Sequence, residues 1–241
     1  MTPIETLRQW ILESNRAVFF GGAGVSTESG IPDFRSDSGI YKKKFMYPAE
    51  TMLSHSFFVH KTAEFYDFYK TVMLYPDAQP NACHKILAQM EADGHIAAVV
   101  TQNIDGLHQA AGSRTVWELH GSVLRNYCGK CRAFYDLDYI LRSSGIPICS
   151  KCGGVVKPDV VLYEEGLDGH TIDGAVTAIR RADLLIVGGT SLAVYPAAGL
   201  IDYYRGHRLV LINLQPTPYD DRADLVIHDK LGNVLTNAYG G

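Results

Sequence analysis

This sequence lacks long apolar runs and has no excess of basic charge. No stretch of about 18 consecutive apolar residues is present, so a membrane-spanning helix is not expected. Lys and Arg number 22 against 26 Asp and Glu, a formal charge of −4 that argues against binding nucleic acid or acidic membranes through the overall field. The first residues, MTPIETLRQWILESN, lack the basic and then apolar organisation of a secretory signal. We therefore expect a cytoplasmic protein without direct nucleic-acid or membrane partners.

Cysteine is also scarce, and four of the five cysteines form a C-x2-C-x17-C-x2-C pattern: Cys128, Cys131, Cys149 and Cys152. Each pair can present two thiolates to a tetrahedral ion, and the intervening length fits a zinc ribbon. A redox dithiol is the alternative, but two matched pairs argue against it. Four thiolates leave no open position for water, so we predict one structural Zn²⁺ that does no chemistry.

Apolar runs at 17–20, 96–100, 116–119, 184–187, 209–212 and 225–227 predict buried strands. Helical periodicity at 3–14, 81–92, 172–181 and 196–205 separates many of them. This alternation predicts an α/β fold, a doubly wound Rossmann-like parallel sheet with a smaller module made of a zinc ribbon and a helical insertion. We expect the sheet domain to comprise 1–35, 76–121 and 161–241, a cofactor loop and helical insertion 36–75, and the zinc-ribbon module 122–160.

Small residues follow the first predicted strand, in the segment GGAGVSTESGIPDFR at 21–35. They allow the backbone to approach a ligand closely, as at a nucleotide phosphate. Gly22, Gly24 and Thr27 nearly match the dinucleotide fingerprint, but Thr27 replaces its third glycine and the usual acidic residue is not evident. An ordinary tight turn is an equal alternative. The loop at 33–50 carries Arg35, Asp37 and lysines 42–44; its length favours a functional lid, and the lysines favour a solvated face.

Polar residues follow two further strands. Gln102, Asn103 and Asp105 come after 96–100, where open parallel sheets bind ligands, although they could instead cap the next helix. His120 follows 116–119; an imidazole there can take a proton from a sugar hydroxyl, and a hydrogen-bonded structural histidine is the alternative.

Six segments follow one another along the chain: GAGVSTESGIPDFR, TQNIDGLH, LHGS, the paired C-x-x-C, KPDVVLYEE and GTSLAVYPA. Together they resemble the motifs of the sirtuins, the NAD-dependent protein lysine deacylases. The resemblance runs from about residue 10 to about residue 235 and is strongest to small bacterial enzymes. It implies acylated-lysine proteins or peptides as substrates and NAD as a consumed cosubstrate. The acyl oxygen would attack C1′ of the nicotinamide ribose, and His120, as general base, would help deprotonate a ribose hydroxyl that attacks next. Nicotinamide, free lysine and O-acyl-ADP-ribose would be the products.

The resemblance also implies the site residues. Catalytic roles would fall to His120, Asn103 and Asp105. The NAD site would comprise Ala23, Gly24, Thr27, Phe34, Arg35, Gln102, Asn103, Ile104, Asp105, His120, Gly188, Thr190, Ser191, Asn213, Lys230 and Leu231. An extended peptide would bind the backbone of Val160, Val161, Leu162, Leu192 and Val194. Substrate specificity should therefore depend only weakly on the side chains of the peptide.

Within the NAD site, the resemblance implies these contacts: Ala23, Gly24, Thr190, Ser191 and Arg35 at the pyrophosphate; Phe34, Ile104 and Asp105 at the nicotinamide; Gln102 and Asn103 at its ribose and a water; Asn213 at the adenine ribose; Lys230 and Leu231 at the adenine.

Relatives that prefer succinyl or malonyl lysine carry a Tyr-x-x-Arg pair in the helical insertion. Here Tyr66 matches the tyrosine, but Tyr69 stands in place of the arginine. A neutral phenol does not match a carboxylate as a guanidinium does, so we expect uncharged acyl groups, acetyl first. Two other functions stay open: ADP-ribosyl transfer to a protein from the same NAD site, and a non-catalytic NAD-binding or zinc-ribbon interaction module.

Overall fold

The computed structural model of the chain describes residues 1–36, 39–42 and 44–240. The α-helices are α1 (Pro3–Glu13), α2 (Ala49–Met52), α3 (His55–His60), α4 (Thr62–Phe68), α5 (Ala82–Ala92), α6 (Leu107–Ala110), α7 (Leu137–Arg142), α8 (Gly169–Arg181) and α9 (Leu231–Tyr239). The strands are β1 (Ala17–Gly21), β2 (Ile96–Thr101), β3 (Val116–Glu118), β4 (Gly121–Cys128), β5 (Phe134–Tyr135), β6 (Val156–Val160), β7 (Leu184–Gly188), β8 (Leu209–Ile212) and β9 (Leu225–Ile227). Short 3₁₀ helices span Ala23–Val25, Thr27–Ser29, Ile40–Lys42, Ala197–Tyr203 and Asp220–Arg222, and Tyr69–Met73 forms a π-helical turn.

The larger part of the molecule is built on a parallel sheet with the strand order β3-β2-β1-β7-β8-β9. Every residue of β1 and β7 is buried, as expected for central strands covered on both faces. The chain winds from β1 to one side and from β7 to the other. The gap between β1 and β7 is therefore the topological switch point, where such sheets bind ligands.

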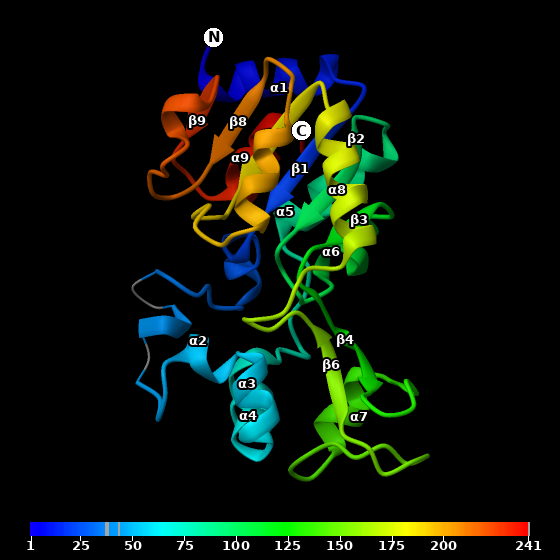
Figure 1. Ribbon diagram of the computed structural model, residues 1–241. Helices are drawn as coiled ribbons and strands as arrows, with labels where there is room; N and C mark the ends of the chain where they lie inside the picture. Colours follow the sequence, from blue (N-terminus) through cyan, green and yellow to red (C-terminus); the bar gives the residue numbers. More distant parts are fainter. Residues whose placement is uncertain (37–38, 43, 241) are drawn as a thin grey trace.

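Helices cover both faces of this sheet (Figure 1). On one face, α1, α5 and α9 pack on inward-facing residues such as Phe19 and Ile186. On the other, α8 and the Ala197–Tyr203 segment pack on residues such as Phe20 and Val187. The alternation of neighbouring residues between two cores confirms the predicted doubly wound sheet.

Capping residues stand at the starts of two of the predicted helices. Thr2 and Glu5 form a capping box at α1, with Pro3 as its first residue, and Asn81 caps α5. The segment expected to be a helix over 196–205 is a 3₁₀ helix, with i to i+3 bonds such as Gly199 N to Pro196 O at 3.0 Å. Gly199 lies inside it, and glycine disfavours an α-helix.

The smaller part combines a three-stranded antiparallel sheet, ordered β5-β4-β6, with α7 and the helices of the insertion (Figure 1). One apolar core joins them: Phe65, Tyr66 and Tyr69 pack in the same cluster as Ile140, Val156 and two of the zinc-motif cysteines. The insertion and the ribbon thus form one module, as predicted. The small sheet, α7 and α9 are not among the elements that the sequence patterns predicted.

The segment 33–50 is partly ordered by this module. Ile40 is buried in the module core, and α2 begins at Ala49, near the end of the segment. Asp37, Ser38 and Lys43 of the expected lid lie outside the described residues. In the described part of the chain, no helix has the length and apolar character needed to cross a bilayer.

Candidate functional site

Two glycine turns meet at the switch point between β1 and β7. Gly24 N donates to Gly189 O at 2.8 Å, and Gly22 N donates to Gly188 O at 3.2 Å. A Cβ on Gly24 would lie 2.7 Å from Gly189 Cα, and Gly189 itself has a φ of +62°. Both positions therefore require glycine, because no side chain fits between the turns. Ala23 begins the short helix after this contact, and Thr27 Oγ1 donates to Gly24 O at 3.0 Å.

The ends of β2, β7 and β8 are joined through Thr190. Its N–H donates to Asn213 Oδ1 at 3.0 Å, and Asn213 Nδ2 donates back to Thr190 O at 3.1 Å. Gln102 Nε2 donates to Thr190 Oγ1 at 3.0 Å. The structure thus brings together three residues that are 23 to 111 positions apart in the sequence. Ser191, the residue after Thr190, is exposed.

Ser26 links the polar residues that follow β2. Its hydroxyl donates to Asp105 Oδ2 at 2.6 Å and accepts from Asn103 Nδ2 at 3.0 Å. Asp105 Oδ1 also accepts from Leu107 N at 2.9 Å, so the expected alternative of helix capping holds for this one contact. Sequence analysis missed Ser26, although it lies inside the glycine-rich segment. Its hydroxyl fixes the two side chains that were predicted to act.

His120 is held by main-chain contacts on two sides. Its Nδ1 lies 2.9 Å from Gln102 O, and Val161 N donates to His120 O at 3.0 Å. Because a carbonyl oxygen can only accept, Nδ1 carries the proton and Nε2 keeps its lone pair. Burial lowers the pKa of His120, and the bond to Gln102 opposes that shift. The imidazole is therefore neutral near pH 7, the form that can accept a proton.

Phe34 and Arg35 lie on the loop next to Tyr41. The Phe34 and Tyr41 ring centroids are 5.4 Å apart, and the Arg35 guanidinium lies 5.3 Å from the Tyr41 ring. The Tyr41 hydroxyl contacts that of Tyr163, just beyond the predicted peptide-binding residues. This contact joins the predicted cofactor loop to the predicted substrate segment.

Leu231 and Lys230 lie at the start of α9. The Leu231 side chain is only 4 % exposed and packs beneath Gly188 and Gly189, so only its backbone can face a ligand. Lys230 is exposed. Ile104, the third residue predicted for the nicotinamide, contacts the smaller module, and its carbonyl accepts from Val123 N at 2.9 Å.

The predicted peptide-binding residues lie in two segments with occupied backbone groups. Val161 N is bound to His120 O, and Leu162 N donates to Glu165 Oε2 at 2.9 Å. Leu192 is buried with a φ of +53°, and Val194 O accepts from Ala198 N at 2.8 Å. Val160 ends β6 with its side chain buried. A peptide would therefore have to use backbone groups other than these.

The four predicted metal ligands converge. The sulfur atoms of Cys128, Cys131, Cys149 and Cys152 all lie within 4.8 Å of one another. Two of the S···S separations, 3.4 and 3.6 Å, compare with the roughly 3.8 Å between thiolates on a tetrahedral zinc ion. Lys130 N and Cys131 N each lie 3.4 Å from Cys128 Sγ, in position to stabilise a thiolate. The donor set and its spacing fit one structural Zn²⁺.

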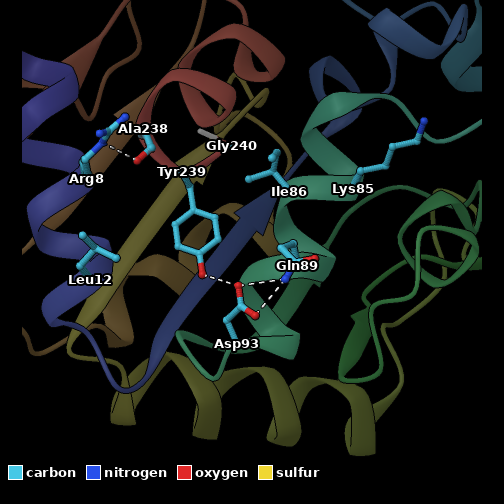
Figure 2. Close-up of a pocket in the computed structure, with 9 residues that line it drawn as sticks. All are labelled: Arg8, Leu12, Lys85, Ile86, Gln89, Asp93, Ala238, Tyr239 and Gly240. Carbon is cyan, nitrogen blue, oxygen red and sulfur yellow. Dashed lines mark hydrogen bonds between the residues drawn. The ribbon is translucent and has the colours of Figure 1, made fainter.

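A separate pocket of about 650 Å³ opens between α1, α5 and α9 (Figure 2). Its polar groups bind one another: Tyr239 donates to Asp93 at 2.6 Å, Gln89 donates to the same carboxylate, and Arg8 donates to Ala238 O. None of the described residues that line it belongs to the predicted site.

Comparisons with known proteins agree with this geometry. A sequence model of the Sir2 family matches residues 22–196. A protein named NAD-dependent protein deacetylase from Clostridium acetobutylicum is 60 % identical over 235 residues, covering 96 % of each chain.

Solved structures agree as well. A Sir2 structure with a deacetylated peptide and an O-acetyl-ADP-ribose is 40 % identical, with a TM-score of 0.89 over 98 % of this chain and 97 % of that one. A Sir2 structure with a propionylated peptide is also 40 % identical, with a TM-score of 0.85 over 98 % and 96 %. The chain belongs to the Sir2 family of NAD-dependent protein deacetylases.

Proposed function

We propose that this chain removes acetyl groups from protein lysines with NAD as cosubstrate, and that His120 is the general base. The observation that carries this assignment is the His120 imidazole, neutral and with Nε2 unprotonated, beside the residues that follow β2. In the reaction, the acyl oxygen displaces nicotinamide at C1′, and the acyl group finally leaves on ADP-ribose.

The residues at the switch point fit a dinucleotide. The contact between Gly24 and Gly189 leaves small, backbone-rich turns at the ends of β1 and β7, which suit a pyrophosphate. Ala23, Gly24, Thr27, Gly188, Thr190 and Ser191 would hold the phosphates, with Arg35 reaching them from the loop, because a guanidinium matches phosphate geometry. Asn213 would bind the adenine ribose, and Lys230 with the backbone of Leu231 would approach the adenine.

The polar cluster after β2 would orient the nicotinamide half. Ser26 holds Asp105 Oδ2 and Leu107 N holds Oδ1. Each carboxylate oxygen can accept more than one hydrogen bond, so Asp105 would also accept from the carboxamide, next to Phe34 and Ile104. Gln102 and Asn103 would hold the ribose and a water. His120 would then take the proton of a ribose hydroxyl at Nε2.

The zinc site would stabilise the smaller module and supply no chemistry. Four thiolates complete the coordination of a Zn²⁺ ion, so the metal offers no position to a substrate or water. The predicted sheet domain would comprise 1–35, 76–121 and 161–241. The cofactor loop and helical insertion would be 36–75, and the zinc ribbon would be 122–160.

Acetyl and other uncharged acyl groups are the proposed substrates. Tyr66 and Tyr69 are both fully buried, and the Tyr66 hydroxyl donates to Val156 O. The helices of the insertion, from Ala49 to Met73, have two lysines, which bind other groups: Lys61 donates to Tyr47 at 2.9 Å and Lys70 to Ser143 O at 2.6 Å. Among the described residues of 49–73, neither lysine is therefore left to pair with a succinyl carboxylate.

The proposed partners are acylated-lysine proteins in the cytoplasm, without direct nucleic-acid or membrane contact. They would bind backbone groups of Val160, Val161, Leu162, Leu192 and Val194 other than Val161 N, Leu162 N and Val194 O, which are bound within the chain. The net charge of −4 supports this view. An assay with acetylated peptide and NAD tests the function through release of nicotinamide, deacetylated peptide and O-acetyl-ADP-ribose. Labelled ADP-ribose on protein without deacetylation, or no nicotinamide release, would contradict it.

A further inference from the structure

A three-residue bulge in β4 follows His120 closely. Ser122 pairs with Asp159 of β6, and the next paired residue, Asn126, is opposite Pro158. Val123, Leu124 and Arg125 are therefore extra residues on one strand, opposite a single step on the other. Bulges of this kind re-aim side chains and are common next to active sites.

The bulge touches the predicted nicotinamide segment. Val123 N donates to Ile104 O at 2.9 Å, and a Cβ on Gly106 would lie 2.5 Å from Leu124 Cδ1. The bulge thus packs directly against the turn that contains Asp105.

Arg125, the last residue of the bulge, binds two carboxylates from two different sheets. Its NH1 lies 2.7 Å from Glu118 Oε2, and its Nε lies 2.8 Å from Asp159 Oδ2. Glu118 ends β3 of the six-stranded sheet, and Asp159 belongs to β6 of the small sheet. A planar guanidinium can hold both partners in fixed directions, which an ammonium cannot.

Both carboxylates belong to the chain segments that fix His120. Glu118 pairs with Thr101 and is two residues before His120. Asp159 is two residues before Val161, whose N–H donates to His120 O. The Asp159 carbonyl oxygen also lies against Gly121, where a Cβ would come within 1.8 Å of it. The ion pairs therefore join the end of β3, just before His120, to the strand that leads to the proposed peptide site.

We propose that Arg125 is a positioning residue that fixes the His120 imidazole relative to the peptide segment Val160, Val161 and Leu162 by binding Glu118 and Asp159 together. This inference rests on the proposed role of His120. The Glu118 side chain is only 9 % exposed, so this half of the pair is better shielded from solvent than an ordinary surface ion pair.

Two reactions separate positioning from folding. Deacetylation needs the base, whereas exchange of labelled nicotinamide into NAD, measured with acetylated peptide, reports the bond cleavage that precedes the base step. Arg125→Met should lower the deacetylation kcat about tenfold, because a small displacement of a reacting group is costly, and leave exchange within about twofold of wild type. Arg125→Lys should recover part of the loss.

Matched variants sharpen the test. Arg208→Met removes a similarly exposed arginine, paired with Glu13 at 2.6 Å, and should leave both rates unchanged. Glu118→Gln should lower deacetylation alone, and combining it with Arg125→Met should add little, because the two residues act as one unit. Thermal unfolding of every variant shows whether its fold is retained.

Equal loss of exchange and deacetylation in Arg125→Met, or a loss no larger than in Arg208→Met, would overturn the proposal. If His120→Ala loses deacetylation while Arg125→Met keeps it, the positioning role alone fails. If His120→Ala keeps full deacetylation, the base assignment fails and the positioning role with it.

Discussion

The His120 Nδ1 atom lies 2.9 Å from the carbonyl oxygen of Gln102, the first residue after β2. This bond fixes the imidazole tautomer, since the carbonyl can only accept. It also fixes the ring against the segment that carries Asn103 and Asp105. The segment after β2 thus holds the proton acceptor next to the residues expected at the nicotinamide and at its ribose.

The acid limb of activity should follow His120. Because burial lowers its pKa below the ordinary value of 6.5, the neutral base persists to lower pH than a free histidine would. We expect kcat/KM for acetylated peptide to fall only below pH 6.5, in a profile measured at saturating NAD. An acid limb centred above that value would contradict the burial argument.

His84 and His108 should make the fold sensitive to acid. Their ring centroids are 4.7 Å apart, and no hydrogen-bond partner is found among the described residues for His84 Nε2 or either His108 nitrogen. Burial lowers the pKa of His84 to about 4, partly opposed by the charge of Asp105, and that of His108 to about 3.

The sign follows from proton binding. The unfolded chain, with histidine pKa values near 6.5, binds more protons than the folded one below that pH. Above pH 6.5 the two histidines are neutral in both states and leave the free energy of unfolding unchanged with pH. As the pH drops toward 4, each histidine should lower that free energy by up to about 1.4 kcal/mol per pH unit. Urea unfolding of His108→Phe should show a shallower dependence, whereas exposed His207→Ala should match wild type. Parallel slopes for all three would refute the idea.

Zinc removal should unfold the smaller module. Cys128 and Cys149 belong to the same core as the helical insertion, so a chelator should lower the Tm and abolish deacetylation, and added Zn²⁺ should restore both. Replacement by Co²⁺, checked by its thiolate absorption bands, should leave kcat nearly unchanged. A large change in kcat with the fold intact would mean that the metal takes part in the reaction.

Gly24→Ala should separate the two glycine turns. Its Cβ would come within 2.7 Å of Gly189 Cα, a clash of backbone with backbone that should cost about 1–3 kcal/mol. We expect a lower Tm and weaker binding of ADP-ribose by calorimetry. Gly166→Ala is the matched control, because its Cβ would meet nothing within 4 Å. Equal ADP-ribose affinities in the two variants would contradict a phosphate site at this contact.

Acyl selectivity should follow charge. Since Lys61 and Lys70 of the insertion already bind other groups, a succinyl carboxylate would be buried without a partner. We expect kcat/KM to be at least about tenfold higher on acetyl than on succinyl peptide of the same sequence, with propionyl close to acetyl. A preference for succinyl would refute the assignment.

Local patterns explain what the sequence could predict. The buried strands are short apolar runs, and the cysteine spacing is a local signal for four converging thiolates. The sequence predicted the glycine turn after β1 but not its contact with the turn after β7, because no local pattern shows that Gly24 and Gly189 meet.

Contacts made through space were not predictable. The bridging role of Ser26 depends on Asp105, which is 79 residues away, and the bulge at Arg125 depends on its register against β6. The segment 196–205, predicted as a helix, forms a 3₁₀ helix. Backbone donors that were expected to bind a peptide, such as Val161 N, form hydrogen bonds within the chain.

The role of His120 is the centre of this account, and one comparison tests it most directly. His120→Ala should bind NAD and keep its Tm yet lose deacetylation of an acetylated peptide, while His207→Ala should behave as wild type. Full deacetylation by a folded His120→Ala protein would contradict the assignment of His120 as general base.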